Sequence, residues 1–204
     1  MQVAAPGTAS GPNQMIPIIA TPGNLALIAT YGDSACVGLD VVDSLGETWS
    51  SLPAEINSCG FSSGGAYGRF FYVVRTKGGA DEITVSTEDA CAFGAFAIEY
   101  AGVASDEPID DSSGVIPTAP TDTMTAGMIA ATGDDLLVAV FVDRRDAPVT
   151  MAPGSGYREL AHDDAFAALI EDHAVGDGTF TPTAGLGSAT GDCWIGASVA
   201  LRAK

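Results

Sequence analysis

The sequence carries one pattern of short apolar runs twice, in the same order. The run at 25–31, Leu-Ala-Leu-Ile-Ala-Thr-Tyr, is echoed at 136–142 by Leu-Leu-Val-Ala-Val-Phe-Val, and an acidic turn follows each run. Further on, an apolar strand opens at Cys91 in the first copy and at Cys193 in the second. The repetition predicts one sandwich built from two similar halves, because each half alone would leave a sheet face exposed.

Turn-forming residues separate the apolar runs. The 204 residues include 25 glycines and 11 prolines, which leave no long helical pattern. We therefore expect an all-β, antiparallel two-sheet sandwich at 24–204 as a single domain, with half-repeats at about 24–102 and 124–203. The expected strands are 25–31, 36–42, 48–55, 69–76, 82–87 and 92–101, then 124–131, 136–143, 157–162, 164–171, 178–182 and 193–202.

Three segments need separate interpretation. Residues 1–23 are rich in proline and glycine and predict an extended N-terminal arm that lies on another surface. Residues 103–123 carry acidic residues and three prolines, and we expect a linker without a regular element. Residues 164–170 have helical propensity, but their alignment with the run beginning at Phe70 favours a strand.

The charge of the chain excludes two classes of partner. With 26 acidic and 8 basic residues, the net charge is −18. Such a surface repels nucleic-acid phosphates and anionic membranes. Residues 1–14 have neither a basic nor an apolar segment of the kind that opens an export leader, and no stretch is long and apolar enough to cross a bilayer.

The four cysteines, Cys36, Cys59, Cys91 and Cys193, form no Cys-x-x-Cys pair, so they do not indicate a zinc or thioredoxin-like site. Two disulfides are the prediction, and buried free thiols the alternative. Because Cys91 and Cys193 occupy equivalent places, we expect them to pair between the halves, and Cys36 to pair with Cys59. Sequence alone leaves three connectivities open.

No catalytic motif stands out, and we expect a protein that is not an enzyme. A metal site formed by His162, Asp163, Asp172 and His173 is conceivable on a hairpin, although solvated turn residues are the simpler interpretation. Glu99 is the best single carboxylate for glycoside hydrolysis, but it has no partner acid in the second copy, and a bond to the backbone or to an arginine is the favoured role.

We expect no cofactor. Calcium is the weak exception, because Asp106, Asp110 and Asp111 place oxygen ligands close together without the order of a calcium-binding loop.

Aromatic residues near turns offer candidate ligand-binding positions. Tyr67 lies in the glycine- and serine-rich segment 60–68 and is the best exposed candidate for stacking on a sugar, and Tyr157 is the second. For Trp49 and Trp194 we expect core packing.

Several packing and turn motifs together resemble a known family. They are Asp43-x-x-Gly46-x-Thr48-Trp49 and the segments 83–85, 97–103, 135–139 and 156–158, with a closing strand at Trp194. Residues 24–203 resemble the lectin-like (concanavalin A-like) jelly-roll domains of bacterial surface proteins and of tailed-bacteriophage structural proteins. The resemblance implies an antiparallel jelly roll used for attachment or for decorating a particle, and it implies no catalytic residues.

Two functions follow as expectations. The first is a virion structural protein, such as a capsid decoration, head-fibre or tail component, whose residues 1–23 dock on neighbouring subunits and whose disulfides close in an oxidising medium. The second is a secreted or surface carbohydrate-binding module. Both place the protein in a virion or outside the cell, without nucleic-acid or membrane partners.

Overall fold

The computed structural model describes residues 13–58, 65–88, 91–144, 150–187 and 193–204, together with the backbone of 2–3 and 7–9. Within these residues there are 20 strands and no helix, and all the strand pairs are antiparallel. The all-β antiparallel sandwich predicted from the sequence is confirmed. The alternative of a helix at 164–170 is wrong, because a turn at 164–167 leads directly into a strand.

The first half contains a larger and a smaller sheet. The larger sheet has the order β1-β10-β4-β8-β6, and β2 and β7 also pair with β10 and β8. Its strands are β1 (Gln2–Val3), β2 (Gly7–Ala9), β4 (Leu25–Asp33), β6 (Ser50–Ser51), β7 (Glu55–Asn57), β8 (Ala66–Val74) and β10 (Phe93–Tyr100). The smaller sheet has the order β3-β9-β5 and consists of β3 (Asn13–Ala20), β9 (Gly79–Ser86) and β5 (Asp40–Asp43).

The second half repeats this arrangement. Its larger sheet has the order β11-β20-β14-β17-β16 and consists of β11 (Ile109–Val115), β14 (Leu136–Asp143), β16 (Arg158–Asp163), β17 (Ala168–Ala174) and β20 (Trp194–Leu201). The smaller layer consists of two short sheets, β12-β19-β15 and β13-β18. Its strands are β12 (Thr123–Thr125), β13 (Ile129–Ala131), β15 (Ala152–Pro153), β18 (Gly178–Phe180) and β19 (Thr183–Gly185).

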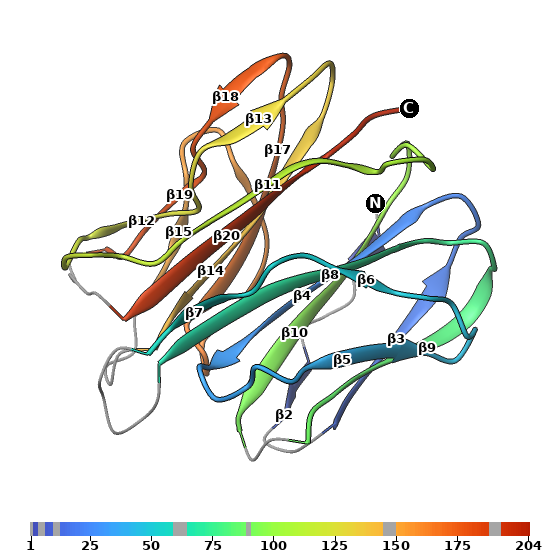
Figure 1. The fold of residues 1–204 in the computed structure, drawn as a ribbon, viewed down its shortest axis with the longest axis horizontal. Coiled ribbons are helices and arrows are strands. Elements are labelled where there is room, and N and C mark those ends of the chain that lie inside the picture. Colours follow the sequence, from blue (N-terminus) through green and yellow to red (C-terminus); the bar gives the residue numbers. More distant parts are fainter. Residues whose placement is uncertain are drawn as a thin grey trace.

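The sheets stack as four layers, with the two larger sheets at the centre (Figure 1). The largest apolar cluster lies between them, where Leu27 and Tyr31 of β4 meet Val140 of β14 and Val199 of β20. Ile28 points to the other side of β4, into a second cluster under the β3–β9–β5 sheet. Every residue from Leu25 to Gly32 is buried, because both faces of β4 are covered.

The repeat is more complete than the sequence indicated. β11 pairs with β20 as β1 and β2 pair with β10, so the expectation that 103–123 contains no regular element is wrong. An edge strand with one exposed face tolerates acidic residues, which explains why this strand was missed. Residues 13–20 of the N-terminal segment are extended, but they form β3 on the chain's own sheet, where Ile16 is buried.

Candidate functional site

The two tyrosines proposed as ligand-binding residues lie in different surroundings. Tyr67 is on β8, fully buried beneath the β3–β9–β5 sheet, so the expectation that it is exposed is wrong. Glycine-rich composition suggested a loop up to residue 68, but the strand already begins at Ala66. Tyr157 is half-buried with its ring centroid 5.0 Å from that of His173, and burial together with the nearby Glu171 raises its pKa to about 12. Tyr157 therefore remains the only one of the two that ligands can reach.

The acidic residues considered for calcium have structural partners. Asp110 accepts hydrogen bonds from Arg202 Nη2 (2.6 Å) and Thr132 Oγ1 (2.9 Å), and these bonds lower its pKa. Asp111 accepts one from the Ala130 N–H at 2.8 Å. Asp106 is exposed on the turn before β11. These bonds hold the edge strand β11 against its neighbours.

The two histidines do not converge on a shared ion. His162 Nδ1 lies 2.7 Å from Glu159 Oε1, and this hydrogen bond raises its pKa. His173 is at the other end of the β16–β17 hairpin. The carboxylate of Asp172, the residue before it, accepts hydrogen bonds from Nε and Nη2 of Arg158. Among the described residues, no group of three or more His, Cys, Asp or Glu side chains is placed to hold a metal ion.

Glu99 has the structural role expected of it. The buried carboxylate accepts hydrogen bonds from the Thr21 N–H (3.1 Å) and from Asn24 Nδ2 (2.7 Å), and so it fixes the turn between β3 and β4. Trp194 is buried in the core, and Trp49 is partly buried with its indole N–H donated to Asp43 Oδ2.

One disulfide joins Cys36 to Cys91, with their Cα atoms 5.6 Å apart. The predicted pairings of Cys91 with Cys193 and of Cys36 with Cys59 are therefore both wrong. Cys36 follows β4 and Cys91 precedes β10, and the ends of these antiparallel neighbours meet. Cys193 is also disulfide-bonded, and Cys59 lies outside the described residues. A disulfide is compatible with an extracellular protein, and the described chain has no helix long and apolar enough to span a membrane.

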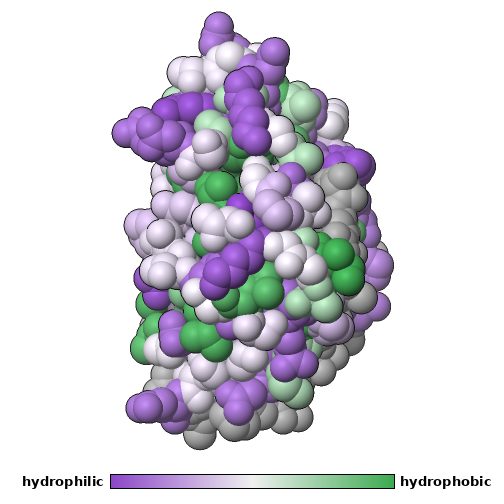
Figure 2. Space-filling view, turned by 90° about the vertical axis from the view of Figure 1, so that its right-hand side faces the viewer, coloured by the Kyte–Doolittle hydropathy of each residue, from purple (hydrophilic) through white to green (hydrophobic). Residues whose placement is uncertain are grey.

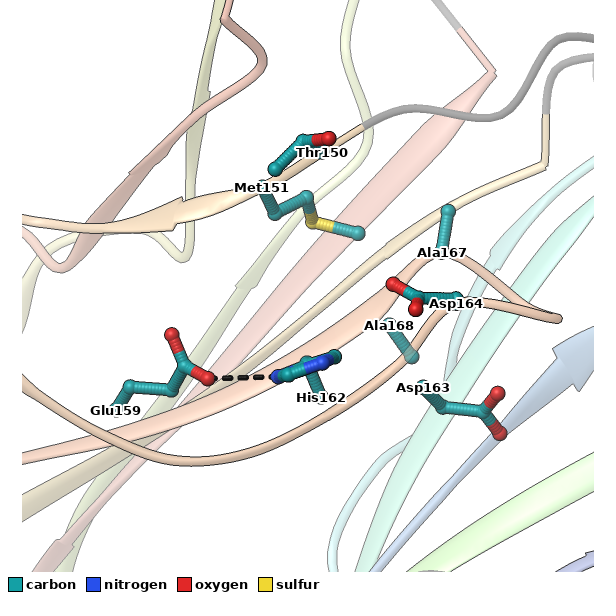
Figure 3. Close-up of a pocket in the computed structure, with 8 residues that line it drawn as sticks. All are labelled: Thr150, Met151, Glu159, His162, Asp163, Asp164, Ala167 and Ala168. Atoms are coloured by element: carbon teal, nitrogen blue, oxygen red, sulfur yellow. Dashed lines mark hydrogen bonds and ion pairs between the residues drawn. The ribbon is translucent and has the colours of Figure 1, made fainter.

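A hollow of about 180 Å³ lies between the segment before β15 and the β16–β17 hairpin (Figure 3). Met151 and Ala167 give it apolar walls, and the bonded pair Glu159 and His162 lies at its rim. Asp163 points away from the other side chains in Figure 3, and its Oδ2 accepts a hydrogen bond from Tyr31 at 2.9 Å. None of the described residues that line the hollow is a phenylalanine, tyrosine or tryptophan on which a sugar could stack.

The outer surface of the β3–β9–β5 sheet exposes large apolar side chains. We call the outward-pointing residues of these strands the β3–β9–β5 face; they are Asn13, Met15, Pro17, Ile19, Asp40, Val42, Ala80, Glu82, Thr84 and Ser86. Met15, Ile19 and Val42 are exposed by 64%, 56% and 52%. Met15 and Val42 flank Thr84 in one row across the sheet. Figure 2, which views the right-hand side of Figure 1, shows hydrophobic patches among hydrophilic residues.

The described strands of the second half do not form such a face. The exposed residues on its equivalent strands are small or hydroxylated: Thr123, Ala130, Ala152, Gly178 and Thr179. Among the described residues of the second half, the large apolar residues that are exposed are Ile116 and Met128. Both lie between strands. The second half thus adopts the same layered arrangement without a large exposed apolar residue on the described strands of its outer layer.

Comparisons with known proteins give no relative: no family model matches, nor does any curated protein or any solved structure. The resemblance to lectin-like jelly rolls remains a prediction from sequence motifs.

Proposed function

We propose that this protein is a non-catalytic structural component of an extracellular particle, a virion decoration, fibre or tail protein, and that the β3–β9–β5 face attaches it to a neighbouring subunit. The supporting observation is the exposure of Met15, Ile19 and Val42 on this face, where the equivalent described strands of the second half expose only small or hydroxylated residues. Exposed apolar residues rimmed by polar ones mark interaction sites. Because β3 belongs to residues 1–23, the N-terminal segment remains part of the proposed contact.

The contact is made by side chains and not by addition of a strand. β3 is an outer strand of its sheet, so its free edge could template pairing with another chain. Pro17 stands in the middle of β3 and has no N–H to donate. A partner therefore packs against the exposed face and leaves the strand edge unpaired.

The other candidate functions have less support. The carboxylates considered for catalysis or metal binding have structural partners: Glu99 holds a turn, Asp163 accepts from Tyr31 and Asp172 accepts from Arg158. Of the histidines, His162 is bonded to Glu159 and His173 packs against Tyr157. A carbohydrate-binding module needs an exposed aromatic platform. The burial of Tyr67 removes the first candidate and leaves only the half-buried Tyr157 of the two.

Co-sedimentation tests this proposal. Particles from the native source are purified on a density gradient in the presence of the tagged protein. We expect the wild-type protein to sediment with the particles at a fixed ratio, and the double variant Met15→Ser, Ile19→Ser to remain in the soluble fractions.

The matched control is Met128→Ser, which removes an even more exposed methionine (73%) from the second half. This variant should sediment as the wild type does. Wild-type protein that stays wholly soluble would refute the structural role, and equal sedimentation of the double variant would refute the assigned face.

A further inference from the structure

A pocket of about 100 Å³ opens at the seam between the two halves, where β8 of the first half meets β11 and β20 of the second. Glu55 of β7 is its only titratable lining residue. The apolar side chains of Leu52, Pro53 and Phe70 and the hydroxyl of Ser112 also line the pocket. We call this site the seam pocket.

The Glu55 carboxyl group has no partner within the described part of the chain. Neither a hydrogen bond nor an ion pair satisfies it, and its partial burial raises its pKa. It lies directly against Gly114, where a Cβ atom would overlap the carboxyl group. Glycine at 114 thus lets an acidic side chain from one half enter the seam beside the other half.

The second half shows how the chain satisfies an equivalent carboxylate. The strand registers place Glu55 in the first half at the position that Asp163 has in the second. Asp163 receives a hydrogen bond from the Tyr31 hydroxyl across the seam, at 2.9 Å. The position equivalent to Tyr31 is held by Val142, which cannot donate. At this seam the chain therefore provides a hydrogen-bond donor for Asp163 but none at the equivalent position for Glu55.

We propose that the seam pocket binds an alkylammonium group, the end of a lysine side chain or of a free amine, with Glu55 as its counter-ion. Leu52, Pro53 and Phe70 would contact the alkyl stem, as apolar walls do for long basic side chains. The hydroxyl oxygen of Ser112, which lies on the same face of β11 as Gly114, can accept one of the remaining ammonium protons. The net charge of −18 favours a cation over a neutral donor at this site.

Titration with n-butylamine tests the proposal, with n-butanol as the neutral analogue of the same length. We expect butylammonium to shift the NMR signals of Glu55, Ser112 and Ser113 saturably, and butanol to bind at least tenfold more weakly. Bound butylammonium should also lower the pKa of Glu55, because an adjacent cation favours the carboxylate.

Two variants locate the site. Glu55→Gln and Gly114→Ala should each weaken butylammonium binding at least tenfold, the first by removing the charge and the second by filling the space beside it. The matched control Glu82→Gln changes an exposed carboxylate on the outer sheet and should bind as the wild type does.

Unchanged binding in Glu55→Gln, or equal binding of n-butanol, would overturn the proposal. The two sources of the ammonium group are then compared by titrating N-acetyl-lysine methylamide and putrescine. Tighter binding of the capped lysine supports a lysine of a partner protein, and tighter binding of putrescine supports a free polyamine.

Discussion

Arg75 in the first half and Val175 in the second occupy the same place in the fold. Each follows the strand that pairs with the central strand of its half, and each donates its backbone N–H to the residue before that central strand, Asn24 or Asp135. Val175 packs into an apolar cluster. A buried apolar residue is therefore enough to close this corner of the fold.

In the first half, the same corner is an ionic cluster. The Arg75 guanidinium is fully buried and lies 2.9 Å from Asp43, 2.8 Å from Glu47 and 2.9 Å from Asp81. The Trp49 ring packs against it, with the guanidinium carbon 5.2 Å from the ring centroid. Three carboxylates around one guanidinium fix the turn after β5. The comparison shows that this cluster is an addition specific to the first half.

Replacing Arg75 tests the comparison most severely. Arg75→Val gives the first half the apolar residue of the second but leaves three carboxylates without their cation. We expect a loss of about 3–5 kcal/mol in the free energy of unfolding at pH 7. Urea denaturation measures it. The control Arg202→Val removes a partly exposed arginine, whose ion pairs are screened by solvent, and should cost far less than Arg75→Val.

Lowering the pH should reduce the difference in the free energy of unfolding between the wild type and Arg75→Val. Burial opposes ionisation of Glu47, but hydrogen bonds from Arg75, Thr76 and Lys77 outweigh it and lower its pKa. A lowered pKa contributes stability that is present above the unfolded-state value and is lost as the pH falls through the folded-state value. A difference that is constant from pH 7 to pH 3 would contradict the role of the cluster.

A smaller effect is expected at the seam, where Tyr31 binds Asp163. Tyr31→Phe leaves the buried carboxylate of Asp163 without its hydroxyl donor and should cost about 1–3 kcal/mol. Because the halves share the central core, calorimetry should still show a single transition. Tyr72→Phe, in a half-buried tyrosine of β8, is the control and should change stability little. Two separate transitions would show that the halves unfold independently.

An effect that depends on pH concerns Glu171, a fully buried carboxyl of the second half that accepts a hydrogen bond from the Gly154 N–H at 2.9 Å. Burial raises its pKa to about 7. The folded protein then binds more protons than the unfolded chain, so its stability falls as the pH rises from 5 to 7, by at most about 1.4 kcal/mol per pH unit.

Glu171→Gln should remove this slope. The variant should gain stability relative to wild type as the pH rises, which urea denaturation at pH 5, 6, 7 and 8 would measure. Parallel curves for the two proteins would mean that Glu171 titrates near its ordinary pKa in the folded state.

The sequence predicted the parts of the fold that are covered on both faces. The runs at 25–31 and 136–142 are almost continuously apolar because they lie between two layers, and both are central strands. Strands with one exposed face were harder to find. In β3 the alternation of exposed and buried residues is hidden by apolar Met15 and Ile19 on the outside, and in β11 acidic residues and Gly114 resemble a loop.

The candidate sites depend on register, which single-sequence patterns do not give. Whether Tyr67 faces the core or the solvent is decided by where β8 begins. Glu55 lacks the hydroxyl donor that Asp163 has, and this difference appears only when the two larger sheets are superposed strand by strand. The net charge, in contrast, was readable at once from the composition, and it contributes to the choice of a cationic ligand.

The two halves meet through equivalent sheets, much as the subunits of a symmetric dimer do, but a single chain joins them. Linkage turns association into an intramolecular event that does not depend on the concentration of the protein. Dilution separates the subunits of a weak dimer, but it does not separate these halves. Each half is thereby free to diverge on its outer side without loss of the contact that holds the pair together.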